Sequence, residues 1–303
     1  MLHKLISGLR IVSVWTDYNS AYHKGSDNIK DPKFFESFKR KISGARFVKI
    51  YRRGKNVLME LDNGQTILVH MKMTGHLLYG TYKRISNSKF LISKKGGSRG
   101  KETWVTEEKG PLGDFRNQFI HFVVSLSDGK HLALSDMRKF AKVTLVPTAK
   151  LKTSEHLKDI GPEPLEKTFT FEKFCERIMT RPRWKIKQAL MNPEIVAGIG
   201  NIYSDEMLWL AGIHPLSTAE KVPEKVLGEL FPAMKEILKK GIDFGGDSTS
   251  DYRNPLGVHG KFHYHHKAYR NTGKLCEKRG CKGVIRRLRL GGRSAHFCGT
   301  HQK

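Results

Sequence analysis

The sequence predicts an α+β protein, with a β-rich first half, a helical region and a short cysteine-bearing end. Alternating and β-branched apolar runs occupy residues 1–147, and DNG at 62–64 and SDG at 127–129 are turn signals between strands. From about residue 168 to 241, apolar residues recur at helical spacing. The stretch 276–303 carries three of the four cysteines. These observations predict a β domain, a helical domain and a small cysteine-bearing module, in that order along the chain.

The strands of the first half are predicted from four stretches: VKIYRRGKNVLMEL, QTILVHMKMTG, NQFIHFVVSLSDGKHLALSD and KVTLVP. The opening MLHKLISGLR is typical of a helix that ends near Gly8. Residues 84–116 are polar and rich in glycine, lysine and serine, which predicts a long exposed loop. GPEPL at 161–165 is typical of a linker. The expected segments are a β domain at 1–147, a linker at 148–167, a helical domain at 168–261 and a cysteine module at 262–303.

Charge is the strongest compositional signal. Lysine and arginine total 55 against 29 aspartate and glutamate, a net charge of +26. Such an excess predicts a polyanionic partner, because contacts with phosphates release counterions. No apolar run approaches the roughly 18 residues of a membrane span, and four cysteines are too few for a disulfide framework. We therefore expect a nucleic-acid-binding protein of the cytoplasm; a solubility surface or ribosome association is the alternative.

The cysteine end has the spacing of a structural zinc site. Cys276 and Cys281 form one close pair, and Cys298 and His301 form a second, separated from the first by a hairpin-length segment. Cys175 lies far upstream on a helical pattern and is expected in the core. We therefore predict one structural Zn²⁺ held by three cysteines and a histidine. The alternative is a disordered tail with reduced cysteines.

The stretch EIVAGIGNIYSDE at 194–206 places Gly198 and Gly200 directly before Asn201, between two helical patterns. Glycine permits positive φ, and a tight turn entering a helix presents free backbone N–H groups that bind phosphate. The glycines therefore indicate a phosphate-binding turn, and close packing of two helices is the alternative.

The stretch around these glycines resembles a known family. KIKQALMNPEIVAGIGNIYSDEMLWLAGIHP is similar to the helix–two-turns–helix of the formamidopyrimidine-DNA glycosylase / endonuclease VIII family, and the bacterial formamidopyrimidine-DNA glycosylases are the closest branch. RRGKNVLMEL, HMKMTG, DMRKFAKV, GPEPL, GGDS and the cysteine end match further family motifs in the right order. The finger departs from the usual pattern of two Cys-x2-Cys pairs. GGDS at 245–248 resembles the start of the family's lesion-pocket loop.

The resemblance implies an N-terminal β-sandwich, a helix–two-turns–helix domain with a zinc finger, and DNA in the cleft between them. It implies base-excision repair of oxidised purines, 8-oxoguanine and formamidopyrimidine, in duplex DNA, with strand cleavage at the abasic site. The expected partner is damaged double-stranded DNA. We expect a monomer that binds no membrane, in a bacterial-type cytoplasm and associated with the nucleoid.

Three residues correspond to family positions that handle the DNA backbone, and two more are expected phosphate contacts. Lys55 matches the lysine that contacts phosphate and assists β-elimination, and Arg293 matches the finger arginine linked to δ-elimination. Asn201 matches the phosphate-binding asparagine. Arg183 and Lys187 precede the glycine turn and are expected phosphate contacts, with a solvated helix face as the alternative.

Three further residues correspond to positions at the base stack, and a fourth lies near positions that face DNA. Met73 matches the methionine that fills the gap left by an extruded base, Arg138 the arginine facing the orphaned base, and Phe140 the wedge in the stack. His70 lies near positions that face DNA in the family. Taken singly, Met73, His70 and Phe140 are equally compatible with a buried core position, and Arg138 with a surface ion pair.

The opening of the chain differs from that of the family. Family members begin Met-Pro-Glu, and their proline amine and glutamate perform base excision. MLHKLISGLR aligns with the end of the family's first helix, so the nucleophile segment is expected to be missing from the chain as given. We favour a start site assigned too far downstream, because the downstream motifs match in detail. The alternatives are a non-catalytic damaged-DNA-binding protein and a basic zinc-finger protein for RNA.

Overall fold

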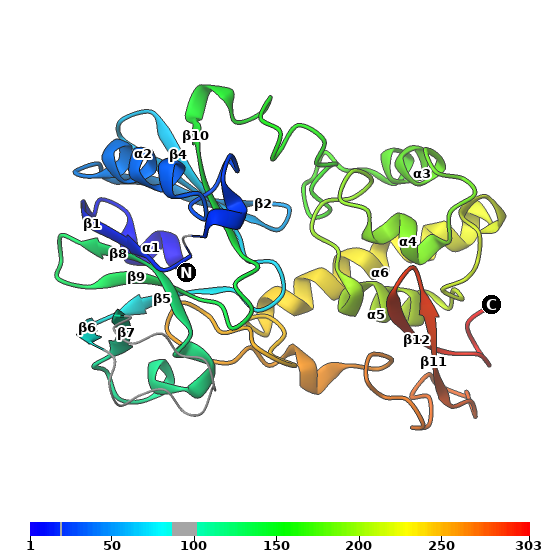
Figure 1. Ribbon diagram of the computed structural model, residues 1–303. Coiled ribbons are helices and arrows are strands. Elements are labelled where there is room, and N and C mark those ends of the chain that lie inside the picture. Colours follow the sequence, from blue (N-terminus) through cyan, green and yellow to red (C-terminus); the bar gives the residue numbers. More distant parts are fainter. Residues whose placement is uncertain (19, 87–101) are drawn as a thin grey trace. The chain divides into compact units, whose positions relative to one another are not determined.

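The computed structural model describes residues 1–303 apart from residue 19 and residues 87–101 (Figure 1). The chain forms two compact units. Unit 1 contains Met1–Arg52, Asn56–Ser154 and Ser248–Gly260. Unit 2 contains Arg53–Lys55, Glu155–Asp247 and Lys261–Lys303. Strands dominate unit 1 and helices dominate unit 2, which confirms the expected α+β fold class.

Unit 1 is built on two four-stranded sheets. The first has the order β1 (Ile11–Thr16), β8 (Ile120–Leu126), β9 (His131–Ser135), β5 (His76–Gly80). The second has the order β10 (Lys142–Pro147), β4 (Gln65–His70), β3 (Asn56–Leu61), β2 (Phe47–Arg53). Fully buried side chains of both sheets, such as Phe122 and Ile67, belong to one apolar core, so the sheets form a sandwich.

Two helices complete this core. Helix α1 (Leu2–Ile6) precedes Gly8, whose φ of +81° confirms the predicted helix end. Helix α2 (Pro32–Ile42) was not predicted, although Asp31 caps it by accepting from the amides of its first turn and proline stands at its first position. Phe38 of α2 is 1% exposed and packs among the strand side chains.

The prediction of a single loop at 84–116 was wrong at both ends. Strands β6 (Tyr82–Ser86) and β7 (Glu102–Thr106) form a two-stranded sheet, and short 3-10 helices follow at Pro111–Gly113 and Phe115–Asn117. Trp104 of β7 explains the difference, because its ring packs edge-on against Trp15 with 6.1 Å between centroids. The middle of the predicted loop, 87–101, lies outside the described residues.

Unit 2 contains four α-helices, which lie in the region of predicted helical spacing, and a hairpin. The helices are α3 (Phe171–Met179), α4 (Ile186–Met191), α5 (Asn201–Ala211) and α6 (Glu224–Asp243), and the hairpin is β11 (Ile285–Leu290) with β12 (Arg293–Cys298). Phe174, Leu208 and Leu230 join the helices in one core. Further 3-10 turns lie at Ala21–His23 and Thr148–Lys150 in unit 1, and at Ala219–Lys221 and Phe262–His265 in unit 2. Among the described helices, none has the length and apolarity to cross a membrane.

Residues 248–260, called the strap below, belong to unit 1 although the sequence placed them in the helical domain. The amide of Tyr79 in β5 donates to Pro255 O at 2.7 Å. Gly257 has φ +79°, and a Cβ there would lie 2.7 Å from the carbonyl carbon of Pro111. The strap therefore packs closely against the segment after β7, which sequence patterns within the helical region could not indicate.

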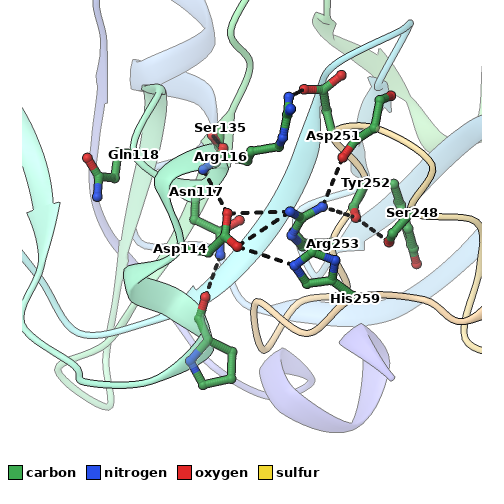
Figure 2. Close-up of polar contacts among 12 residues, drawn as sticks. Asp114, Arg116, Asn117, Gln118, Ser135, Ser248, Asp251, Tyr252, Arg253 and His259 are labelled. Atoms are coloured by element: carbon green, nitrogen blue, oxygen red, sulfur yellow. Dashed lines mark hydrogen bonds and ion pairs between the residues drawn. The ribbon is translucent and has the colours of Figure 1, made fainter.

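A polar cluster holds the strap (Figure 2). Arg253 is 3% exposed and donates to Asp114 at 3.4 Å and to its own segment's Tyr252 O at 2.9 Å. His259 lies 3.2 Å from the same carboxylate. Arg116 forms an ion pair with Asp251. Three acid–base pairs thus join the strap to the 3-10 turns of unit 1.

We expect Arg253→Met to destabilise unit 1 by about 2 kcal/mol, because it leaves Asp114 without its buried partner. Denaturant unfolding measures the loss, and hydrogen exchange at the Tyr79 amide reports whether the strap has loosened. Arg40→Met, at an exposed position of α2, is the matched control. Unchanged exchange at Tyr79 in the Arg253 variant would contradict an anchoring role.

The same cluster predicts a dependence on pH. Burial acts to raise the pKa of Asp114, but the Arg116 amide, His259 and Arg253 outweigh it and lower the pKa. A lowered folded-state pKa stabilises the fold above the unfolded pKa, and this contribution is lost as pH falls through the folded pKa. Wild type should therefore lose stability below about pH 4, and Asp114→Asn should lose less. Thermal unfolding of both proteins tests this, and equal slopes would disprove it.

Candidate nucleic-acid interface and metal centre

The turn between α4 and α5 has the backbone form that its glycines predict, and phosphate binding there stays a prediction. Gly198 has φ +86°, a conformation that other residues adopt at a cost, and Gly200 caps α5 in an extended conformation. Helix α5 begins at Asn201 and has no acidic residue in its first turn. Its positive end is therefore available for an anion.

A cavity of about 400 Å³ lies at this end of α5. Its lining includes Lys55, Lys187, Asn201 and Arg293, four of the residues that the sequence singled out. Lys55 occupies the turn between β2 and β3 rather than a strand, and its Nζ donates to Ile199 O at 2.8 Å. The cavity gathers side chains from a strand turn, two helices and the finger hairpin.

Asn201 has an unsatisfied polar atom in this cavity. Its Oδ1 is buried, and within the described part of the chain it has no hydrogen-bond partner. Oxygen and nitrogen of an amide are assigned from their surroundings, so either end of the group can face the cavity. A buried amide atom without a partner is costly, and in the orientation that places the nitrogen at this position an anion would accept from it and remove that cost.

Lys187 is buried rather than exposed on a solvated helix face. It is 1% exposed and forms a buried ion pair with Asp205 of α5, and its Nζ lies 3.4 Å from Asn201 O. Burial lowers the pKa of Lys187, while Asp205 opposes that shift. A solvated helix face is therefore excluded, and a direct phosphate contact stays a prediction. Arg183 is exposed before α4, outside the cavity lining.

Asp205 was missed from the sequence. Besides Lys187, it accepts from the backbone N–H of His296 at 3.0 Å and lies 3.0 Å from that ring's Nδ1. The carboxylate thus joins α4, α5 and β12. The signal was an acidic pair, Asp205–Glu206, inside the otherwise apolar α5, because buried charges need partners.

The three residues predicted to act at the base stack lie on two loops of unit 1. Met73, between β4 and β5, is 64% exposed, and Phe140, between β9 and β10, is 51% exposed. These values exclude the core alternatives for both side chains. The Arg138 guanidinium lies 5.2 Å from the centroid of the Phe140 ring, a cation–π contact. His70 is half-buried at the end of β4, where its Nδ1 accepts from the Lys72 amide at 3.0 Å.

The four predicted metal ligands meet in unit 2. One ligand atom each from Cys276, Cys281, Cys298 and His301 lies within 4.8 Å of the others. The Cys281 and Cys298 sulfurs are 3.6 Å apart, and Cys276 Sγ lies 3.3 Å from His301 Nδ1. Three sulfurs and one imidazole nitrogen at these separations fit a tetrahedral zinc ion.

Surrounding groups orient these ligands. His301 Nε2 lies 3.0 Å from Trp209 O, so the ring donates there and its Nδ1 lone pair faces the sulfurs. Trp209 Nε1 donates to Cys276 Sγ at 3.3 Å. Although burial opposes it, the amides of His301 and Thr300 lower the pKa of Cys298 to about 6. Burial raises the pKa of Cys276, so of these two thiols Cys298 is the one that its surroundings favour as a thiolate ligand.

Comparison with known proteins identifies the family. The model of the formamidopyrimidine-DNA glycosylase N-terminal domain matches residues 1–143, and that of the formamidopyrimidine-DNA glycosylase H2TH domain matches residues 160–253. This chain belongs to the formamidopyrimidine-DNA glycosylase family.

Relatives named formamidopyrimidine-DNA glycosylase are similar along most of the chain. The one from Herpetosiphon aurantiacus is 34% identical over 274 residues, covering 90% of this chain and 88% of the relative. That from Pelotomaculum thermopropionicum is 32% identical over 275 residues, covering 91% and 87%. Members of the family therefore share both units.

Solved structures of the glycosylase family show the same fold. Lactococcus lactis Fpg in complex with DNA containing an abasic site is 29% identical, with a TM-score of 0.78, and the match covers 100% of this chain and 95% of that one. A complex of the Lactococcus lactis protein with Fapy-dG containing DNA is also 29% identical, with a TM-score of 0.77 and coverage of 100% and 96%.

We expect the purified protein to carry one zinc ion, which native mass spectrometry would detect. Cys298→Ala should abolish metal retention, because three ligands hold zinc far more weakly than four. His301→Cys keeps four donors and should retain zinc. Cys175→Ala, in α3, is the control. Retention of zinc by the Cys298 variant would exclude this site.

Proposed function

We propose that this protein is a base-excision-repair glycosylase that removes oxidised purines, 8-oxoguanine and formamidopyrimidine, from duplex DNA and cleaves the strand at the abasic site. The observation that carries the proposal is the cavity at the start of α5, where Lys55, Asn201 and Arg293 surround a helix N-terminus. The relatives are named formamidopyrimidine-DNA glycosylase, and the solved structures of the Lactococcus lactis protein contain DNA with an abasic site or with Fapy-dG.

A backbone phosphate beside the lesion would occupy the cavity. The N–H groups at the start of α5 and the unsatisfied Asn201 amide supply hydrogen bonds, and Lys55 supplies charge. Such contacts fix the register of the DNA without reading its sequence.

The two exposed loops of unit 1 would enter the base stack. Extruding a nucleotide costs a few kcal/mol, and apolar side chains inserted into the gap offset part of that cost. Met73 would fill the space of the lost base, Phe140 would wedge the opposite strand, and Arg138 would donate to the orphaned base. Their exposure supports these roles.

The strand-cleavage steps release phosphate groups. In β-elimination a proton leaves the sugar C2′ while the bond to the 3′ phosphate breaks, so negative charge grows on the leaving oxygen. Lys55 would stabilise that charge, and Arg293 would assist the second elimination on the other side. Both cations line one cavity, which supports their action on neighbouring phosphates.

The residues of the finger fit a zinc ion. Cys276, Cys281, Cys298 and His301 would hold it, and bound zinc would act as a structural cross-link rather than a reactant. The link would fix the β11–β12 hairpin, whose first residue after the Gly291–Gly292 turn is Arg293. The monomeric state and the cytoplasmic, nucleoid-associated location stay predictions.

Borohydride trapping tests the chemistry directly. A lyase forms a Schiff base with abasic DNA, and reduction converts it into a covalent adduct. We expect an adduct with duplex abasic DNA and nicking of duplex that contains 8-oxoguanine opposite cytosine. Binding without adduct or nicking would identify a damage-binding protein instead. Equal binding of intact and damaged duplex would refute the whole proposal.

The phosphate cavity has its own test. Asn201→Ala should weaken binding to a tetrahydrofuran abasic-site duplex by about 10-fold, through the loss of a hydrogen bond to a charged group. Lys55→Ala should also lower the salt dependence of log K by about one unit, because one phosphate contact disappears. Asn63→Ala, in an exposed turn of unit 1, is the control. Retained affinity in the Asn201 variant would limit that residue to helix packing.

A further inference from the structure

Asp136 is a fully buried carboxylate at the end of β9, with an exposed fraction of 0%. Its Oδ1 accepts from the Thr74 hydroxyl. Its Oδ2 accepts from the Tyr18 hydroxyl at 3.0 Å and from the Ala141 amide at 2.7 Å. A buried charge is tolerated only where donors satisfy it, and these three do so.

The donors connect two separate loops. Thr74 follows Met73 in the loop between β4 and β5, and Ala141 follows Phe140 in the loop between β9 and β10. The loops are also joined directly, because the Arg138 amide donates to Thr74 Oγ1 at 3.3 Å. The Thr74 hydroxyl therefore donates to the carboxylate and accepts from the second loop.

The loops are in contact at Gly75. A Cβ at this position would lie 2.6 Å from Met71 O and 3.2 Å from the Cβ of Ala141. Only glycine permits the first loop to turn this tightly while its backbone lies against the second. A displacement of one loop must therefore push on the other.

Each loop contains a lysine with left-handed backbone. Lys72 and Lys139 both have φ +55°, a conformation that costs free energy outside glycine and persists only where surrounding contacts enforce it. Lys139 is held through its carbonyl, which accepts from Lys30 Nζ at 2.6 Å, and through its amide, which donates to Asp136 O at 3.1 Å. For Lys139, the backbone of Asp136 is therefore one of the contacts that enforce this conformation.

We propose that Asp136 is a positioning residue that sets Met73, Arg138 and Phe140 as one rigid unit for insertion into an interrupted base stack. The proposal rests on the proposed function for its DNA role, but the mechanical coupling of the loops is a property of the free protein. The competing explanation is an ordinary buried carboxylate that contributes to stability alone.

The coupling is tested without DNA by hydrogen exchange on the zinc-loaded full chain. Tyr18→Phe is the decisive variant, because Tyr18 belongs to neither loop and loses only its bond to Asp136. We expect faster exchange of the amides of Gly75, Lys139 and Ala141 together. Thr74→Val should have the same effect and Thr74→Ser should restore wild-type exchange. Faster exchange in one loop alone, in either variant, overturns the proposal.

The DNA role is tested by binding of a tetrahydrofuran abasic-site duplex and of the same strand alone. Thr74→Val should weaken duplex binding by about 10-fold, as expected for a lost charge-assisted hydrogen bond, while single-strand binding changes little because no stack must be opened. Thr66→Val, which removes another buried hydroxyl of unit 1, is the matched control and should leave both affinities unchanged.

The outcomes separate the two proposals. Equal loss on duplex and single strand would assign Asp136 a stability role and overturn its positioning role. If wild type did not prefer the abasic-site duplex, the proposed function would fall, and the exchange experiment would still decide whether Asp136 couples the loops. Faster exchange in both loops, together with weaker binding of the duplex but not of the single strand, supports the inference in full.

Discussion

One buried carboxylate, Asp205, joins three of the elements around the cavity at the start of α5. It is 1% exposed and is shared by Lys187 of α4 and His296 of β12. Removing either partner would leave a buried charge without compensation, so the three elements are held at fixed separations. Arg293 lies three residues before His296 in the same strand, and therefore its approach to the start of α5 depends on this pairing.

The distribution of acidic residues follows a common rule in both units. The chain has an excess of 26 positive charges, yet several acids are removed from the surface. Glu206 accepts from the backbone amides of Lys267, Ala268 and Tyr269, and Asp136 organises two loops. Carboxylates placed inside fix irregular backbone, and they no longer oppose the basic surface that a polyanion would meet.

Local patterns predicted the parts of the fold that depend on neighbours in sequence. Strand alternation, the glycine turn before Asn201 and the close ligand pairs of the finger are all short-range signals, and the structure confirms them. The family resemblance selected Met73 and Phe140, whose exposure no periodicity reveals. The strap and the burial of Lys187 were missed, because both depend on partners distant in sequence, Asp114 and Asp205. Helix α2 was missed despite its local capping signal.

The strap also bears on how the protein is made. Unit 1 includes Ser248–Gly260, so Tyr79 and Asp114 find their partners only after the helices of unit 2 have been synthesised. Domains generally fold in order during synthesis, but here the sandwich of unit 1 is completed by a segment that follows the helices of unit 2. The nascent sandwich is therefore incomplete while the helices of unit 2 emerge, because Ser248–Gly260 follows those helices in the chain.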